Sequence, residues 1–317
     1  MEQSKMVPPT ILLVGATGNT GRSVVETLPK LISNTPLSGH RILALSRSAS
    51  KAAELEKIPG VESEVINWID ISKQWLRDRN VVRAFVATHN EPGQFIYESS
   101  LLVAALKAGV EYVVRISTTA AAITADSENF YPRGHWALEA MLSSPEFERL
   151  HWTSLQPNIF TNFHYLTPAA DLIKEFRKTG KQTKLRLMAS EDAPVGAIDP
   201  WDVGVFAAHL LAEPDTSVHN KAKYVLNGPE DITGRDIVNM VEKEIGEKVQ
   251  DVSFKDMTYV DEIADSYPGT KSIILSMKHA QEPAWEGKAS VSTTSKEFLQ
   301  IAPPKGRAED MLQKLLQ

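Results

Sequence analysis

The stretch "TILLVGATGNTG", residues 10–21, decides the fold. A short apolar run ends at Gly15, and Gly18 and Gly21 follow at intervals of three before the helix-compatible segment "RSVVETLPKLI". Glycine permits a tight turn and a close approach of the main chain, and the N-terminus of the next helix offers free N–H groups to a pyrophosphate. The pattern predicts a strand, a glycine loop and a helix that together bind a dinucleotide.

Apolar runs recur after this loop and alternate with helix-compatible segments over about 120 residues, a spacing typical of βαβ units and a parallel sheet. The runs are "HRILALSRS", "VVRAFVATH", "EYVVRISTT" and "HWTSLQPNIF". Later the alternation loosens into helices separated by loops, one of them with Thr233 as its N-cap and Gly246 as its stop. We predict an α/β fold in which residues 1–155 form a Rossmann-like doubly wound parallel sheet. Segments from about 195–230 contribute to it, and residues 156–317 form mostly a smaller C-terminal α/β substrate-binding region.

Composition excludes several classes of function. The 317 residues include no Cys, which excludes disulfides, thiolate catalysis and Cys-based metal sites. A net charge of −6 argues against nucleic acid or an anionic membrane as the main partner. No apolar run reaches the roughly 18 residues that span a bilayer, and the N-terminal "MEQSKMVPPT" lacks the apolar centre of a signal peptide. We expect a soluble, cytoplasmic protein.

The end of the second predicted strand indicates the cofactor. A site that prefers NAD places Asp or Glu there to accept from the ribose 2′-OH, whereas this sequence has "ALSRS", with Arg47 in that position. A guanidinium holds a 2′-phosphate through its planar fork, and Arg22, after the last loop glycine, is a second cation. We therefore predict NADP(H). Asp70, after the third strand, lies on the adenine side or caps the next turn.

The sequence resembles the NmrA-like branch of the atypical short-chain dehydrogenase/reductase superfamily. The likeness is carried in order by "VGATGNTG", "LSRS", "GHWALEAML", "TSLQPNIFTNF", "YVLNGPEDITGRDIVNMVEKEIGEKV" and "EGKASVSTTSKEFLQIAP". The resemblance implies an NADP(H)-binding domain and a small C-terminal domain that closes a substrate cleft. It does not imply one activity, because the family includes non-catalytic redox-sensing regulators, quinone and enoyl-type reductases, and accessory enzymes of fungal natural-product pathways.

The stretch "YPRGHWALE", residues 131–139, spaces Tyr131 and His135 as Tyr-x-x-x-Lys reductases space their Tyr and Lys. Proline favours the first helical position and drives the residue before it into extended conformation, so Pro132 predicts that Tyr131 lies outside the helix. Three alternatives stay open. The two residues form a catalytic dyad, or His135 alone delivers a proton, or His135 is a structural residue that bonds a carbonyl or the ribose.

In an open α/β sheet the ligand lies beyond the carboxyl ends of the strands, and further candidates follow from that rule. The resemblance to related reductases implies a substrate-polarising hydroxyl at Ser117, after the fifth strand, and so makes it a candidate catalytic residue. The same resemblance implies that the segment with Asn158, Phe160 and Asn162, after the sixth strand, surrounds the nicotinamide and the substrate. The predicted cofactor-binding residues are Gly15, Thr17, Gly18, Asn19, Thr20, Gly21, Arg22, Arg47, Asp70, Thr88, His89, Asn90, Ser117, His135, Pro157, Asn158 and Phe160. The predicted substrate residues are Tyr131, Asn162, Phe163, His164 and Trp285. Asp199 and Asp202 lack a His cluster, so we predict helix capping there and no metal site.

These observations favour an NADPH-dependent reductase of a small, fairly apolar carbonyl or polarised C=C compound, an accessory enzyme of fungal-type secondary metabolism. The alternatives are a non-catalytic NADP(H)-sensing regulator with a protein partner, and a non-redox isomerase or cyclase. We expect a monomer or homodimer that binds a small-molecule substrate, no nucleic acid and no membrane.

Overall fold

The computed structural model describes residues 7–317, so the first six residues of the N-terminal segment discussed above lie outside the described part. Within that part the strands are β1 (Thr10–Val14), β2 (Arg41–Ser46), β3 (Val61–Val65), β4 (Val81–Val86), β5 (Tyr112–Ile116), β6 (His151–Pro157), β7 (Leu185–Arg186), β8 (Ala222–Leu226) and β9 (Val252–Ser253). The helices of the first half are α1 (Gly21–Ile32), α2 (Ala49–Leu55), α3 (Lys73–Asp78), α4 (Gln94–Ala108) and α5 (Phe130–Leu142). Those of the second half are α6 (Thr167–Thr179), α7 (Pro200–Ala212), α8 (Gly234–Ile245), α9 (Tyr259–Asp265), α10 (Lys271–Leu275), α11 (Glu282–Trp285), α12 (Lys296–Ile301) and α13 (Ala308–Leu316).

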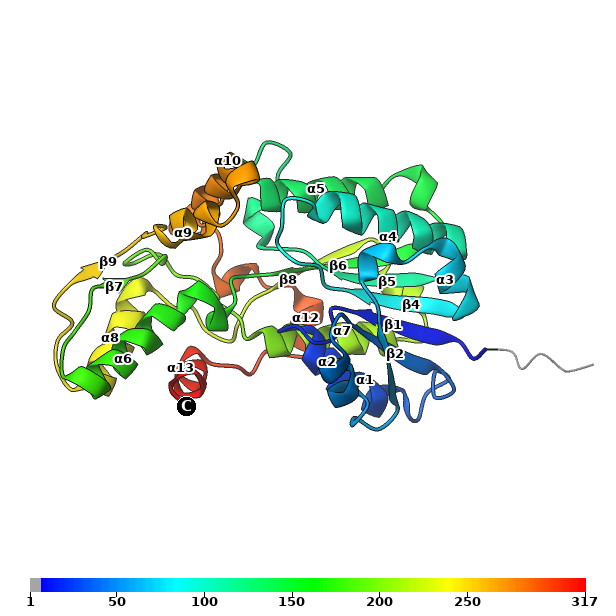
Figure 1. The fold of residues 1–317 in the computed structure, drawn as a ribbon, viewed down its shortest axis with the longest axis horizontal. Helices are drawn as coiled ribbons and strands as arrows, with labels where there is room; N and C mark the ends of the chain where they lie inside the picture. Colours follow the sequence, from blue (N-terminus) through cyan, green and yellow to red (C-terminus); the bar gives the residue numbers. More distant parts are fainter. Residues whose placement is uncertain (1–6) are drawn as a thin grey trace, which may run out of the picture. The chain divides into compact units, whose positions relative to one another are not determined.

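Across residues 7–317, seven strands form the main sheet in the order β3-β2-β1-β4-β5-β6-β8 (Figure 1). The pairs from β3 through β6 are parallel, with registers such as Leu12 opposite Leu43 and Val113 opposite Trp152. The strand order reverses at β1, whose neighbours are β2 and β4, so the carboxyl end of β1 is the switch point at which such sheets bind ligands. The predicted Rossmann-like fold is confirmed.

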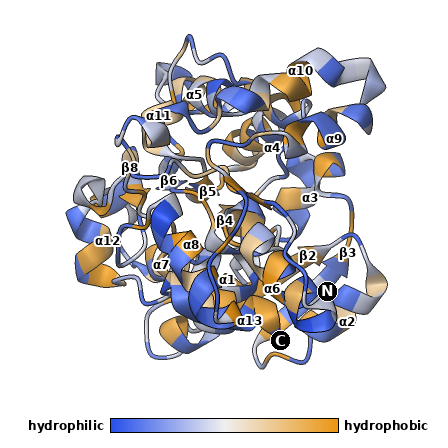
Figure 2. Ribbon diagram, turned by 90° about the vertical axis from the view of Figure 1, so that its left-hand side faces the viewer, coloured by the Kyte–Doolittle hydropathy of each residue, from blue (hydrophilic) through white to orange (hydrophobic). Residues whose placement is uncertain are grey.

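Helices cover both faces of this sheet, as expected for strands that are apolar on both sides. Figure 1 shows α3, α4 and α5 on one face and α1, α2 and α7 on the other. The first layer is a buried cluster in which side chains of the strands, such as Val14 and Trp152, pack against Leu101, Leu102 and Leu138 of the helices. In Figure 2 the central strands are largely hydrophobic, which matches their burial on both sides.

The contacts between residues of the chain divide it into two compact units. Unit 1 comprises the described residues up to Ile116 together with Ala137–Leu155 and Val203–Lys223. Unit 2 comprises Ser117–Trp136, Gln156–Asp202 and Tyr224–Gln317. Its core lies around Leu172 of α6, Ile237 of α8 and Met311 of α13, and it contains the parallel pair of β7 and β9. Each unit therefore has an apolar core that holds its own candidate residues in place.

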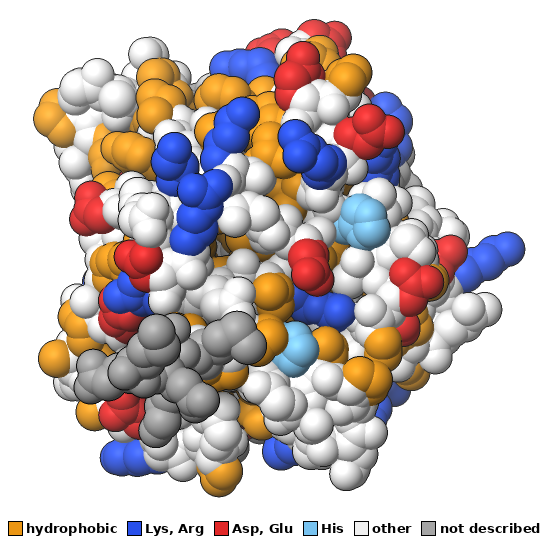
Figure 3. Space-filling model, turned by 90° about the vertical axis from the view of Figure 1, so that its right-hand side faces the viewer, with side chains coloured by type: hydrophobic (Ala, Val, Ile, Leu, Met, Phe, Trp, Pro, Cys, Tyr) orange, Lys and Arg blue, Asp and Glu red, His pale blue; other side chains and the backbone are white. Residues whose placement is uncertain are grey.

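Neither a membrane span nor a metal centre is present in the described part of the chain. Each helix within residues 7–317 is too short or too polar to cross a bilayer. No three His, Asp or Glu side chains gather there in a way that would hold a metal ion. Asp199 accepts the N–H of Trp201 at 2.8 Å, which confirms the predicted helix cap at that residue. Asp202 does not cap the helix, because it lies inside α7 and its Oδ2 accepts the N–H groups of Lys305 and Gly306, each at 2.8 Å. The face in Figure 3 mixes basic and acidic side chains rather than gathering one sign of charge.

Candidate functional site

The loop between β1 and α1 has a shape that only glycine allows. Gly15 has a φ of +83°, and a Cβ built there would lie 2.4 Å from the carbonyl oxygen of Ala87. At Gly21 a Cβ would lie 2.0 Å from the carbonyl oxygen of Gly15. The N–H of Gly18 donates to that same carbonyl at 2.9 Å and closes the turn. Gly15 and Gly21 therefore leave no room for a side chain, which agrees with the close main-chain approach predicted for this loop.

The N-terminus of α1 faces this loop without a side-chain cap. Thr20 occupies the N-cap position in helical conformation, and its side chain accepts no hydrogen bond from the helix. Thr17, Gly18 and Asn19 are exposed in front of it. Uncapped N–H groups and the positive end of the helix dipole form an anion site, so this arrangement fits the pyrophosphate of a dinucleotide.

Arg22 and Arg47, the two predicted cations, have different surroundings. Arg22 pairs with Glu26 one turn further along α1, with Nε 2.5 Å from Oε1. Arg47 follows β2, is exposed, and its guanidinium Nη2 lies 2.6 Å from Nε2 of His89, which follows β4. Because β1 lies between β2 and β4, this contact spans the strand that carries the glycine loop. It brings together two residues that the sequence placed on separate strand ends.

Thr88 and Asn90 flank His89 in the loop after β4, and Asp70 follows β3. The hydroxyl of Thr88 donates to Glu98 Oε2 of α4 at 2.8 Å, whereas Asn90 is exposed. Asp70 ends a short 3₁₀ turn after β3 and is exposed. The strand order places β3 two positions from β1, so Asp70 is not brought to the glycine loop by strand adjacency.

The catalytic candidates of unit 2 lie on α5 and after β5. Asn129 caps α5, because its Oδ1 accepts the main-chain N–H of Tyr131 at 3.0 Å. The helix begins at Phe130, so the expectation that Tyr131 lies outside it is wrong. Pro132 still falls in the first turn, where a missing N–H costs nothing, and the cap outweighs its effect on the preceding residue. Ser117 is buried directly after β5.

Tyr131 and His135 consequently share one face of α5. Their ring centroids lie 4.5 Å apart with the ring planes at 83°. His135 is 1% exposed, whereas Tyr131 is half-buried. Of the two rings, the phenol is the more exposed, and the imidazole is buried beside it.

The segment after β6 is shaped by an irregular turn. Pro157 ends the strand, and Phe160 bridges to Ile198. An irregular turn over Thr161–Tyr165 follows, in which Phe163 has extended rather than helical backbone angles (φ −96°, ψ −156°). Asn162 lies in this turn, and its Oδ1 is buried without a hydrogen-bond partner among the described residues. A buried acceptor without a donor is costly, so a ligand donor at this point would be favourable.

Two aromatic rings of this turn, Phe163 and His164, form a cluster with Tyr259 of α9. His164 stacks on Tyr259 of α9, with centroids 4.1 Å apart and planes at 23°, and Phe163 meets His164 edge-on at 4.4 Å. Burial lowers the pKa of His164 and raises the pKa of Tyr259 to about 12, so both rings are uncharged at neutral pH. Phe163 is 47% exposed, and the cluster presents an apolar surface.

Two other predicted site residues, Asn158 and Trp285, form hydrogen bonds within unit 2. Asn158 is buried, and its Nδ2 donates to Asn227 Oδ1 at 2.8 Å and to the carbonyl of Ala289 at 2.7 Å. Trp285 packs against the core of unit 2, and its indole N–H donates to the carbonyl of Met188 at 2.8 Å. Both residues fix loops of unit 2 in place.

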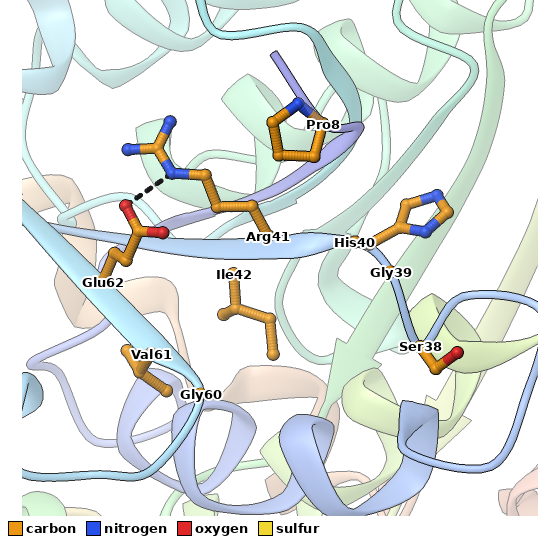
Figure 4. Close-up of a pocket in the computed structure, with 9 residues that line it drawn as sticks. All are labelled: Pro8, Ser38, Gly39, His40, Arg41, Ile42, Gly60, Val61 and Glu62. Carbon is orange, nitrogen blue, oxygen red and sulfur yellow. Dashed lines mark hydrogen bonds and ion pairs between the residues drawn. The ribbon is translucent and has the colours of Figure 1, made fainter. Parts of the chain in front are cut away.

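Each of the two units contains a cavity. One of about 300 Å³ lies within unit 2 and is lined by Thr119, Ala120, Ala121, Gln156, Asn158, Val225, Asn227, Lys288, Ala289 and Thr293. Of these lining residues only Asn158 was predicted as a site residue. The run of small residues after β5, which includes Thr119, Ala120 and Ala121, was a sequence signal for open space at this point. The second, of about 470 Å³, lies where β2 and β3 begin and is bounded by the Arg41–Glu62 ion pair (Figure 4). It is at the sheet edge opposite the glycine loop.

Comparison with known proteins identifies the family. The model described as the NmrA-like family matches residues 8–296. The chain belongs to the NmrA-like family. No curated protein sequence matches this NmrA-like chain significantly.

Solved structures resemble the NmrA-like chain over nearly its whole length. An NADPH-dependent quinone oxidoreductase from Escherichia coli, complexed with NADPH, has 19% identity and a TM-score of 0.71, covering 97% of this chain and 100% of its own. The Citrobacter sp. triphenylmethane reductase complexed with NADP(H) has 17% identity and a TM-score of 0.69, covering 96% and 100%. Leucoanthocyanidin reductase from Vitis vinifera has 12% identity and a TM-score of 0.66, covering 97% and 99%. At these identities the likeness concerns the fold.

Proposed function

We propose that this protein is an NADPH-dependent reductase of a small, fairly apolar carbonyl compound or polarised C=C compound. The observation that carries the proposal is the uncapped N-terminus of α1 behind a loop that only glycine allows, with the Arg47 guanidinium at the neighbouring strand end. The helix N-terminus behind the glycine loop suits a pyrophosphate, and the Arg47 guanidinium suits a 2′-phosphate. The quinone oxidoreductase and triphenylmethane reductase structures, which contain NADPH and NADP(H), support the same cofactor. We further propose a cytoplasmic role as an accessory enzyme of fungal-type secondary metabolism.

Bound NADPH would supply the hydride, and the chain would supply binding and a proton. Glycine-loop N–H groups would hold the pyrophosphate, and Arg47 would hold the 2′-phosphate. The half-buried phenol of Tyr131 would donate a proton to the oxygen or carbon that becomes negative, and His135 would fix the phenol through its ring contact. The uncharged rings of Phe163, His164 and Tyr259 would bind the apolar part of the substrate.

The proposal is tested by the oxidation of NADPH, followed by absorbance, with a panel of quinones, enones and aromatic aldehydes. We expect turnover of at least one class, with a reduced organic product found in an amount equal to the NADPH consumed. Binding of NADPH without turnover of any acceptor would instead favour the regulator. In that case capture of a protein partner should depend on whether NADPH or NADP⁺ is present.

A further inference from the structure

A chain of buried polar groups crosses one face of the main sheet inside unit 1. Arg115 of β5 and Glu98 of α4 are both 0% exposed, and Arg115 Nε lies 2.6 Å from Glu98 Oε1. Arg115 Nη1 also donates to Ser154 Oγ of β6 at 3.0 Å, and this hydroxyl donates to Glu139 Oε1 of α5 at 2.7 Å. Lys223 of β8 lies 3.0 Å from Glu139 Oε2 and is 44% exposed. The two cations balance the two carboxylates.

This chain of groups lies in an otherwise apolar layer. Arg115 and Ser154 are register partners on adjacent strands, and the flanking side chains Val113 and Trp152 belong to the buried cluster beneath α4 and α5. Taking charges out of water costs free energy, and apolar side chains of similar size often give equal or greater stability at such a place. Packing alone therefore does not account for the Glu98–Arg115 pair.

The chain of groups ends at the loop after β4. Thr88 donates its hydroxyl proton to Glu98 Oε2 at 2.8 Å, and Gln94 Nε2 donates to the Thr88 hydroxyl at 3.0 Å. The preceding residue, Ala87, has its carbonyl against Gly15, and its N–H donates to the carbonyl of Val14 at 3.2 Å. The Thr88 side chain is thus fixed one residue from the point at which this loop packs on the glycine loop.

We propose that Glu98 and Arg115 are positioning residues that hold Thr88, and with it the loop that carries His89, against the glycine loop in the geometry that binds the cofactor. This inference rests on the proposed NADPH site. The buried guanidinium fixes the Glu98 carboxylate, and the carboxylate fixes the Thr88 hydroxyl. The pair would thereby set the affinity for NADPH without touching the cofactor.

The test compares cofactor affinity with stability in variants of the full chain. In the double variant Glu98→Leu/Arg115→Met, an apolar pair of similar volume replaces the ion pair, so we expect the midpoint of thermal unfolding to be retained within a few degrees. The Kd for NADPH, from calorimetry, should rise about tenfold or more, as a loss of roughly 1.4 kcal/mol would give. Thr88→Val should raise Kd by a similar factor, and adding it to the double variant should change little further. Thr88→Ser, which keeps the hydroxyl, should restore tight binding.

Tyr112→Phe is the matched control. It removes a buried hydrogen bond between the same two strands, from the Tyr112 hydroxyl to Thr153 Oγ1 at 2.7 Å, without touching the Thr88 network. Its Kd for NADPH should equal that of the wild type. A double variant that loses stability but keeps its Kd, or a Thr88→Val variant with unchanged Kd, would overturn the positioning role. Failure of the wild type to bind NADPH would instead overturn the proposed function itself. If the double variant does not fold, the Thr88→Val and Thr88→Ser comparison decides.

Discussion

The ring of Tyr131 meets the ring of His135 edge-on, with centroids 4.5 Å apart, on one face of α5. Residues four apart on a helix are neighbours, so a Tyr-x-x-x-His sequence can act as a pair only when both residues are helical. Asn129 Oδ1 accepts the N–H of Tyr131 at 3.0 Å, and the helix that it caps begins at Phe130. Both Tyr131 and His135 are therefore helical. The contact makes Tyr131 the candidate proton donor and His135 the residue that holds it.

Tyr131→Phe should lower kcat for NADPH oxidation by about 100-fold, a typical contribution of general acid catalysis. The ring contact with His135 is retained in this variant, so the Kd for NADPH and the unfolding midpoint should stay at wild-type values. Tyr267→Phe, which changes an exposed Tyr of the same unit, is the control. A Tyr131→Phe variant with nearly normal kcat would show that water or another group donates the proton.

Arg47→Asp should weaken NADPH binding by about 10- to 100-fold, because a charge-assisted bond to phosphate contributes roughly 1.5–3 kcal/mol and the new carboxylate repels the anion. NADH lacks the 2′-phosphate and should lose little affinity. Calorimetric titration of both cofactors measures the difference. The exposed Arg149, changed to Asp, is the charge-matched control. Equal losses for NADPH and NADH would refute the 2′-phosphate assignment.

Gly21→Ala should abolish measurable NADPH binding and lower stability by about 1–3 kcal/mol, since the added Cβ overlaps main-chain atoms of the loop. The Cβ would lie 2.0 Å from the carbonyl oxygen of Gly15. Gly39→Ala is the matched substitution, because a Cβ there has no neighbour within 4 Å. The two variants should differ clearly in the free energy of unfolding, measured in urea, and in NADPH affinity, measured by titration. Equal values for the two variants would contradict the loop geometry.

Thr233→Ala should reduce the free energy of unfolding by about 1 kcal/mol, the usual effect of losing an N-cap. Thr233 Oγ1 accepts the N–H of Asp236 at 3.1 Å, and Asp236 Oδ2 accepts the N–H of Thr233 at 2.9 Å, so α8 begins with a capping box. Thr183→Ala, at an exposed position, should have almost no effect in the same urea titration. A neutral Thr233→Ala would mean that tertiary packing alone fixes the start of α8.

Local signals made much of the fold predictable from sequence. The glycine loop, the alternation of strands and helices after it and the Thr233 cap depend on residues close together in the chain, and all three appear in the structure. The position of Tyr131 was predicted wrongly because Pro132 and Asn129 act in opposite directions, and sequence does not give their relative strength.

The buried polar chain around Arg115 was not predicted, because its members come from elements far apart in sequence. One signal was present: Arg115 interrupts the apolar strand "YVVRI", where a charge must find a buried partner. Which carboxylate supplies that partner depends on α4 packing over β5, which sequence does not specify. The Arg47–His89 contact escaped prediction for the same reason, since it joins the ends of β2 and β4.

The most direct test of the account is calorimetric titration of the wild-type protein with NADPH and, in parallel, with NADH. The account predicts saturable binding of one NADPH per chain, at least about tenfold tighter than NADH. Absence of NADPH binding, or a preference for NADH, would contradict the assignment of the glycine loop and Arg47 to NADP(H).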